Sequence, residues 1–209
     1  MTYPVVSAPY GLKPVNLIGG QPYAGSTRTL SIASGYAANI FYGDVVKIVS
    51  GGVIEKDTGT STATPVGIFM GCSFTNPSTK QLQFQQFWPT GTVASDAVAY
   101  VVDDPDVLFK AVLVAGTTAD DTASGLLPAY LGRTVIGSNA ALVQNAGSTT
   151  SGDSKIGVYT AAGATTTATL PIRIVDVVVD TANSSSNSVE LICKWNAPSA
   201  AITIDFTAE

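Results

Sequence analysis

Three closely spaced carboxylates, those of Asp103, Asp104 and Asp106 around Pro105, are the chain's first candidates for chemistry. Such a cluster can bind Ca²⁺, or supply the acid and base of glycoside hydrolysis. However, Asp-Pro-Asp is common in turns, the glycine of a calcium loop is missing, and a second acid such as Asp120 or Asp121 would have to approach through folding. We therefore expect a solvated turn here and no metal site.

Other groups for proton transfer are scarce. The 209 residues include no histidine, and Asp, Glu, Lys and Arg together make up 12% of the chain. Histidine alone has an ordinary pKa near neutral pH, so proton transfer would need a strongly perturbed carboxylate, lysine or tyrosine. Glycine-rich phosphate and dinucleotide motifs, a nucleophile elbow and a C-x-x-C motif are also missing. The sequence predicts a protein that is not an enzyme and needs no cofactor.

The two cysteines, Cys72 and Cys193, allow two interpretations. They could form one disulfide if the fold brought them together, or they could be two separate thiols buried in strands. A reducing compartment favours buried thiols.

Charge and hydropathy exclude two classes of partner. The net charge is −5 and the ten basic residues are scattered singly, a pattern that disfavours nucleic acid. No apolar run is long enough to span a membrane, and the segment Met1–Val6 lacks the features of a secretory signal. We expect a chain that is made in the cytoplasm and does not enter a membrane.

Residues 1–27 differ from the rest of the chain. Four prolines recur among tyrosines and glycines, which excludes a helix and predicts an extended N-terminal arm that lies on a surface, its own or a neighbour's. The residues that we expect at a partner interface come from this arm, with one tryptophan from a later strand: Tyr3, Pro4, Tyr10, Pro14, Tyr23 and Trp88.

Strand patterns fill most of the remainder, residues 28–209. Alternating or β-branched runs separated by glycine turns indicate an all-β fold, an antiparallel β-sandwich or barrel with long loops. Two β subdomains, 28–115 and 150–209, joined by an irregular segment 116–149, are one possible division. The clearest runs are Thr29–Ala33, Ile40–Tyr42, Val45–Val49, Val53–Lys56, Val66–Met70, Gln81–Gln85, Ala97–Val102, Val107–Val114, Leu170–Val179, Val189–Trp195 and Ile202–Phe206.

Aromatic residues near the proline-ended strand could serve in the core or at the surface. Phe84, Phe87 and Trp88 could form a sugar-binding platform or a subunit interface. For Phe84 and Trp195 we expect core positions, because each belongs to an alternating apolar set.

Several segments, densest over residues 10–116, resemble virion proteins encoded beside the major capsid gene in tailed phages of aquatic bacteria, and in particular head decoration (cement) proteins. The similarity is carried by Tyr10–Val15, Tyr23–Arg28, Gly43–Lys47, Thr64–Gly71, Phe87–Pro89 and Val101–Pro105.

This resemblance implies a β-rich subunit, often trimeric, on the outer face of an icosahedral capsid. Its partners would be the major capsid protein and further copies of itself, and its function would be to bridge capsid subunits and stabilise the shell. A carbohydrate-binding or host-adhesion module of a virion is the alternative.

Overall fold

The computed structural model describes residues 6, 8–114, 135–159, 167–181 and 189–196. Every regular element in these ranges is a β-strand, so the all-β prediction is confirmed. No helix in the described ranges is long and apolar enough to cross a bilayer. The strands are β1 Lys13–Leu17, β2 Arg28–Ile32, β3 Val45–Ile48, β4 Val53–Lys56, β5 Gly67–Thr75, β6 Leu82–Gln85, β7 Val98–Val102, β8 Val107–Val114, β9 Asn139–Val143, β10 Gly157–Tyr159, β11 Ile172–Val177 and β12 Val189–Trp195.

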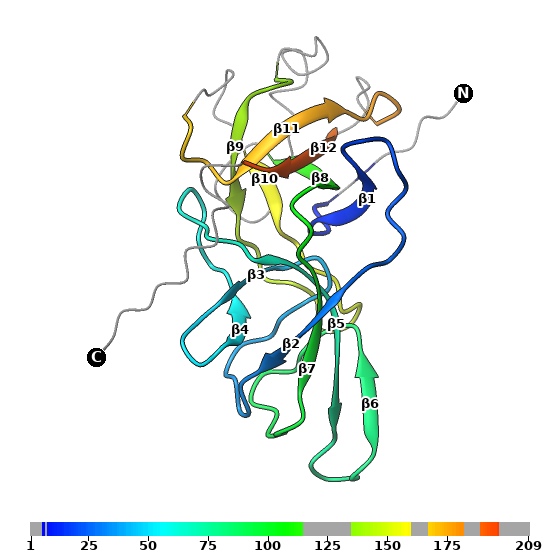
Figure 1. Cartoon of the computed structure of the whole chain (residues 1–209), viewed down its shortest axis with the longest axis vertical. Helices are drawn as coiled ribbons and strands as arrows, with labels where there is room; N and C mark the ends of the chain where they lie inside the picture. Colours follow the sequence, from blue (N-terminus) through cyan, green and yellow to red (C-terminus); the bar gives the residue numbers. More distant parts are fainter. Residues whose placement is uncertain (1–5, 7, 115–134, 160–166, 182–188, 197–209) are drawn as a thin grey trace.

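The strands form two sheets that are stacked along the long axis of the molecule (Figure 1). Strands β8, β10, β9, β11 and β12 follow one another round a closed ring, because β8 also pairs with β12, and β1 lies beside β8. We call this unit the C-terminal barrel. The other sheet, the inserted sheet, has the order β3-β4-β2-β7-β5-β6, and β3 also pairs with β5. Most pairings are antiparallel, with parallel contacts between β2 and β4 and between β8 and β10.

The inserted sheet interrupts the C-terminal barrel in the sequence. The chain enters it at Arg28 and leaves it through the turn at residues 103–106, so β8 belongs to the C-terminal barrel. The sequence-based division had placed residues 107–115 in the first subdomain. It had also left 116–149 irregular, although β9 in that range lies between β10 and β11.

Part of the expected N-terminal arm is built into the C-terminal barrel. Residues Lys13–Leu17 form β1, which pairs antiparallel with β8, and the Leu12 side chain is 0% exposed in the core. Gly11 has a φ of +80°, and a Cβ there would lie 2.7 Å from both the Gly43 carbonyl oxygen and the Ser154 Cβ. Only glycine fits this close approach without strain. From residue 11 onward, this segment is therefore part of the fold.

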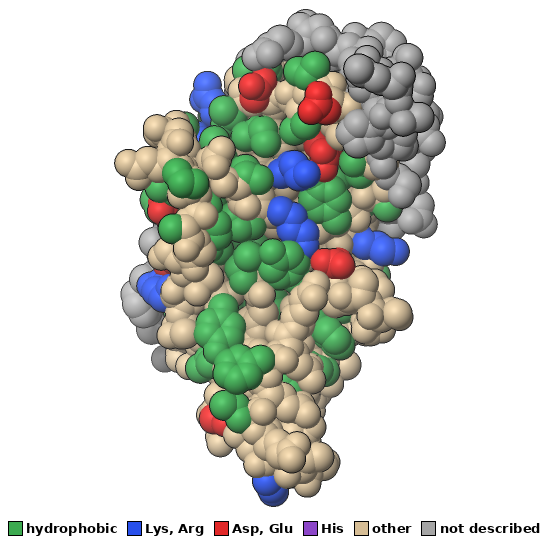
Figure 2. Space-filling view, turned by 90° about the vertical axis from the view of Figure 1, so that its right-hand side faces the viewer, with side chains coloured by type: hydrophobic (Ala, Val, Ile, Leu, Met, Phe, Trp, Pro, Cys, Tyr) green, Lys and Arg blue, Asp and Glu red, His purple; other side chains and the backbone are tan. Residues whose placement is uncertain are grey.

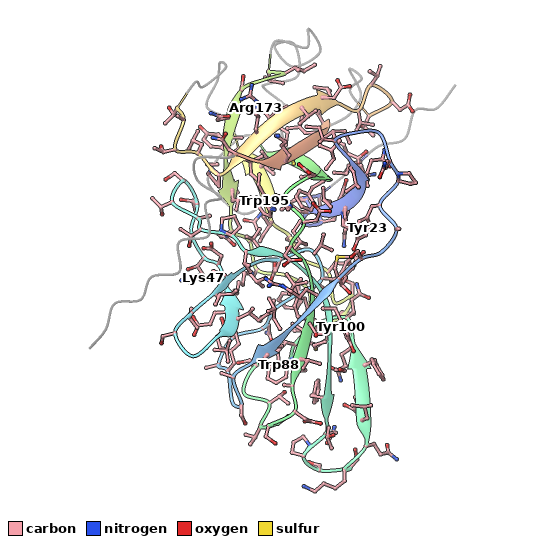
Figure 3. The ribbon with its side chains drawn as sticks, in the orientation of Figure 1. Tyr23, Lys47, Trp88, Tyr100, Arg173 and Trp195 are labelled. Carbon is pink, nitrogen blue, oxygen red and sulfur yellow. The ribbon has the colours of Figure 1, made fainter. Side chains whose placement is uncertain are left out.

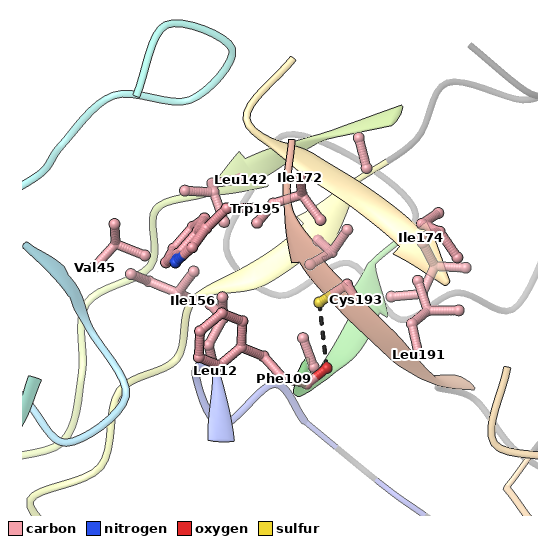
Figure 4. Packing of buried hydrophobic residues seen from close by; sticks show 14 of the residues in the cluster. Leu12, Val45, Phe109, Leu142, Ile156, Ile172, Ile174, Leu191, Cys193 and Trp195 are labelled. Atoms are coloured by element: carbon pink, nitrogen blue, oxygen red, sulfur yellow. Dashed lines mark hydrogen bonds between the residues drawn. The ribbon is translucent and has the colours of Figure 1, made fainter. Parts of the chain in front are cut away.

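The buried apolar residues form two clusters, one centred on each sheet, and Val45, Ile68 and Val102 of the inserted sheet pack into the cluster of the C-terminal barrel. In the C-terminal barrel, Phe109 packs against Trp195 with ring centroids 5.2 Å apart, and the Cys193 thiol donates to the Phe109 carbonyl (Figure 4). In the inserted sheet, Trp88 packs edge-on against Phe74 at 5.3 Å. Cys72 and Cys193 are both buried free thiols, one in each core, as expected from the sequence.

A buried polar cluster joins the two sheets. Asp44, which is 0% exposed, accepts hydrogen bonds from the Phe41 amide at 2.9 Å and from the Ser154 hydroxyl at 2.6 Å. Its carboxylate also pairs with the Lys56 ammonium at 3.0 Å. Ser154 precedes β10 of the C-terminal barrel, whereas Asp44 and Lys56 belong to the inserted sheet. A buried carboxylate with this many partners fixes one relative placement of the sheets.

Candidate interaction surface

The acidic cluster forms the turn between the two sheets. Asp103 pairs with Arg28 at 2.6 Å, and Asp104 accepts a hydrogen bond from the Asp106 amide at 2.9 Å. Arg28 opens the inserted sheet and Asp103 follows its last strand, so this ion pair ties the two crossing points of the chain together. The described ranges contain no group of three His, Cys, Asp or Glu side chains that could hold a metal ion. Asp120 and Asp121 lie outside them.

Three of the predicted interface residues make contacts within the chain's own fold. The Tyr10 hydroxyl donates to Glu190, a buried carboxylate that also pairs with Lys110 at 3.0 Å. Burial and this carboxylate raise the pKa of Tyr10, so the phenol remains neutral. Pro14 lies in β1 opposite Phe109, and the Tyr23 hydroxyl donates to the Ser26 carbonyl at 2.8 Å. Tyr3 and Pro4 lie outside the described residues.

Trp88 is not available to a partner. Its side chain is 0% exposed inside the inserted sheet, and its backbone exchanges two hydrogen bonds with Ile40 (Figure 3). The prediction of an interface tryptophan is therefore wrong. The run Gln81–Gln85 does contain a strand, β6, but the core position expected for Phe84 is wrong, because its side chain is 71% exposed. Trp195 does lie in the core, as expected, at 6% exposure.

Leu82 and Phe84 are two exposed apolar side chains on the same face of one strand, β6. They alternate along β6 with Gln83 and Gln85, and Leu82 is 61% exposed. β6 pairs with β5 so that Phe84 lies opposite Ser73, and Cys72 and Phe74, the neighbours of Ser73, enter the core. The register on β5 therefore turns Phe84 and Leu82 outward. Sequence alternation alone could not show which of the two alternating sets of β6 side chains faces the core.

A shallow hollow of about 450 Å³ opens beside Phe84 on the same outer face. Tyr42, Tyr100, Met70 and Gln86 also line it, and none of the lining side chains carries a formal charge. Burial and the nearby Asp153 raise the pKa of Tyr42, so this phenol stays protonated at neutral pH. The hollow is therefore aromatic and amide-lined.

Gly71, which lines the hollow, lies at an irregularity in β5. The pairing of β5 with β7 shifts between Phe69 and Gly71, and Gly71 has a φ of +140°. A Cβ at Gly71 would lie 3.0 Å from the Gln85 carbonyl oxygen. Beyond the bulge, the Tyr100 and Ser73 hydroxyls are hydrogen bonded at 3.0 Å, which fixes one wall of the hollow.

Figure 2 places this surface on the molecule. The view is from the side on which β6 lies in Figure 1. Hydrophobic side chains form a band down this face, and most charged side chains in the view lie higher up. Lys13 pairs with Asp153 at 3.1 Å, and its ammonium lies 3.5 Å from the centroid of the ring of Tyr42, which lines the hollow. Gln86 also donates to Asp153 at 3.1 Å, which links β6 to this ion pair.

Comparison of the chain with protein-family models, curated proteins and solved structures gave no match, so no family is assigned.

Proposed function

We propose that this chain is a non-enzymatic structural protein of a virion. In this proposal it decorates and stabilises the outer surface of an icosahedral phage capsid, where it bridges major capsid protein subunits as a homo-oligomer. The observation that carries the proposal is the uncharged outer face of β6, on which Leu82 and Phe84 are 61% and 71% exposed. Apolar side chains left together on a surface are typical of a site that another molecule covers.

Several reactive groups in the described ranges are engaged in structural contacts, which also supports this reading. Asp44, Asp103, Asp153 and Glu190 are all in ion pairs. Burial raises the pKa of both thiols to about 12, so neither is a thiolate at neutral pH. Rigid coupling of the two sheets through Asp44 suits a bridging protein, because force applied to one sheet is transmitted to the other.

On a capsid lattice, many small contacts together are sufficient to hold the protein in place. A contact set of about 1 to 3 kcal/mol per copy is weak alone, but an oligomer that holds several such contacts at once dissociates far more slowly. The outer face of β6 therefore need not be large for the protein to stabilise a shell.

The proposal is tested by mixing the purified chain with expanded, empty shells of the major capsid protein from the same phage. We expect the chain to sediment with the shells and to raise their thermal disruption temperature. Phe84→Ala should weaken binding at least about tenfold, as expected for an exposed aromatic anchor. Val179→Ala, which changes a 70% exposed side chain on the C-terminal barrel, is the matched control. Failure of the unaltered chain to bind any shell would rule the proposal out.

Carbohydrate binding is the second candidate. Its site would be the hollow beside Phe84 and not Trp88, which is buried. Uncharged aromatic rings with an adjacent amide suit the apolar faces and hydroxyl groups of a neutral sugar. A glycan array probed with the full chain distinguishes the two functions. Binding that is lost in Phe84→Ala, without any binding to shells, would support the carbohydrate module.

A further inference from the structure

The free edge of β6 presents a specific pattern of backbone groups. Within the described ranges, β6 pairs with β5 alone, in a register that continues to Asn76, whose amide donates to the Gln81 carbonyl. Hydrogen-bonded and non-bonded pairs alternate along an antiparallel ladder. Gln81, Gln83 and Gln85 therefore bond towards β5, and Leu82 and Phe84 direct their N–H and C=O groups towards the free edge.

This edge lacks the usual protection against pairing. Exposed edges are commonly blocked by a charge, a proline or a bulge on the strand. Residues 81–86 read Gln-Leu-Gln-Phe-Gln-Gln, without charge or proline, and the pairing of β6 with β5 shows no register shift. The nearest charge is Lys80 in the preceding turn.

We propose that β6 pairs with β6 of a second copy, antiparallel, about a two-fold axis at Gln83. This inference rests on the homo-oligomer of the proposed function and names one of its contacts. Leu82 then lies opposite Phe84 of the second copy, and each of these two pairs exchanges two backbone hydrogen bonds. All four outward N–H groups of the two edges are satisfied. An axis centred on Leu82 or Phe84 would pair different backbone groups, and Gln83 would no longer lie opposite Gln83 of the second copy.

Charge supports a second copy as the occupant. Two chains of net charge −5 repel each other, so they can meet closely only where a surface is uncharged or complementary. The proposed register places Lys80 opposite Gln86 of the second copy. Gln86 lies 3.1 Å from Asp153, whose side chain is 40% exposed. Each Lys80 therefore approaches Asp153 of the other copy, a carboxylate that also pairs with Lys13 of its own chain, and this happens twice in one two-fold contact.

Pairing enlarges the apolar face rather than hiding it. Leu82 and Phe84 stand on the outer face of the sheet, perpendicular to the edge, so the two copies place four apolar side chains side by side. The resulting platform is continuous across the axis and lies next to both hollows. A two-fold contact joins copies in pairs, and it is separate from any three-fold contact implied by the resemblance.

Gln83→Cys in the full chain tests the pairing directly. At the axis, the two Cα atoms would be about 4.5 Å apart, within disulfide range. Cys72 and Cys193 are buried, so the new thiol is the reactive one in the described ranges. Under mild oxidation we expect covalent dimers to form at least ten times faster than with Gln81→Cys or Gln85→Cys. These two variants should cross-link efficiently only when mixed with each other, because residue 81 lies opposite residue 85.

A second variant separates pairing from random collision. Leu82→Pro removes an outward N–H and leaves the bonds to β5 in place, which an edge strand tolerates. Gln83→Cys with Leu82→Pro should lose the rapid cross-link while keeping the circular dichroism spectrum of the parent. Equal rates for all three single cysteines, or a rapid cross-link that survives Leu82→Pro, would overturn the pairing. Shell binding without a Gln83→Cys cross-link refutes the pairing alone, and a cross-link without shell binding refutes the decoration function alone.

Discussion

Phe84 and Trp88 are four residues apart and have opposite environments. Trp88 is enclosed by Phe74 and exchanges backbone hydrogen bonds with Ile40, whereas Phe84 is 71% exposed on β6. Burial of an aromatic ring contributes to the free energy of unfolding, and exposure makes the same kind of ring available for binding. The two residues therefore separate a contribution to stability, made by Trp88, from the binding role that we propose for Phe84.

Trp88→Ala should lower the free energy of unfolding by about 3 to 5 kcal/mol, because it leaves a large cavity in a closed core. Phe84→Ala should change it by no more than about 0.5 kcal/mol, because the ring contributes little to folding. Urea unfolding gives the free energy of unfolding of both variants when it is followed by circular dichroism. Tryptophan fluorescence gives a second value for Phe84→Ala, which keeps both tryptophans. Similar losses in the two variants would contradict this assignment of the side chains.

At the scale of elements, β1 and Leu12 show what the sequence could and could not predict. The strands with clean alternation, such as β7, β8 and β12, were recognised because turn residues bound them and β-branched residues fill them. The pairing of β1 with β8 was missed, because it joins segments far apart in the chain and the prolines of residues 1–27 suggested an extended arm. Pro14 is compatible with β1 since this strand lies beside the ring of five.

The candidate site was harder to predict than the fold. Alternation located the β6 strand, but only its register with β5 shows that Phe84 faces out. The hollow lies at the bulge at Gly71, and single-sequence patterns reveal neither the bulge nor the residues that it brings beside Phe84. The turn at residues 103–106 was predicted correctly, because Asp-Pro-Asp chemistry is local and needs no knowledge of distant partners.

Leu12→Ala tests whether residues before β1 belong to the folded unit. We expect a loss of about 2 to 5 kcal/mol in the free energy of unfolding, since the Leu12 side chain is 0% exposed in the core of the C-terminal barrel. Ile18→Ala, at the far end of β1 and 49% exposed, is the matched control and should cost less than about 1 kcal/mol. Thermal and urea unfolding give both values. A stable Leu12→Ala variant would restore the interpretation of residues 1–27 as a detachable arm.

At the scale of the whole molecule, each core contains one thiol whose ionisation is coupled to unfolding. Burial raises the pKa of Cys72 and of Cys193 from 9.0 to about 12. Between these values the unfolded chain loses protons that the folded chain retains, so folding stability is complete below about pH 9 and falls as the pH rises towards 12. Lys13, whose pKa burial lowers, opposes this trend, but four tyrosines with raised pKa values act in the same direction as the thiols.

Raising the pH from 8 to 10.5 under reducing conditions should therefore lower the free energy of unfolding, by roughly 2 kcal/mol per thiol. Urea titrations at both pH values measure this change. Cys72→Ala with Cys193→Ala should be less stable than the parent at pH 8 but should lose less on going to pH 10.5. An equal loss in parent and double variant would show that the thiols do not contribute to the alkaline transition.

The interruption of the C-terminal barrel by the inserted sheet dictates an order of events during synthesis. When β1 leaves the ribosome, its partner β8 has not been translated, and the whole inserted sheet must emerge first. Pairing of β2 with β7, with the Arg28–Asp103 ion pair beside it, holds the two ends of that sheet close together, which shortens the effective distance between β1 and β8. The inserted sheet must therefore be synthesised in full before the earliest strand of the C-terminal barrel can meet its partner.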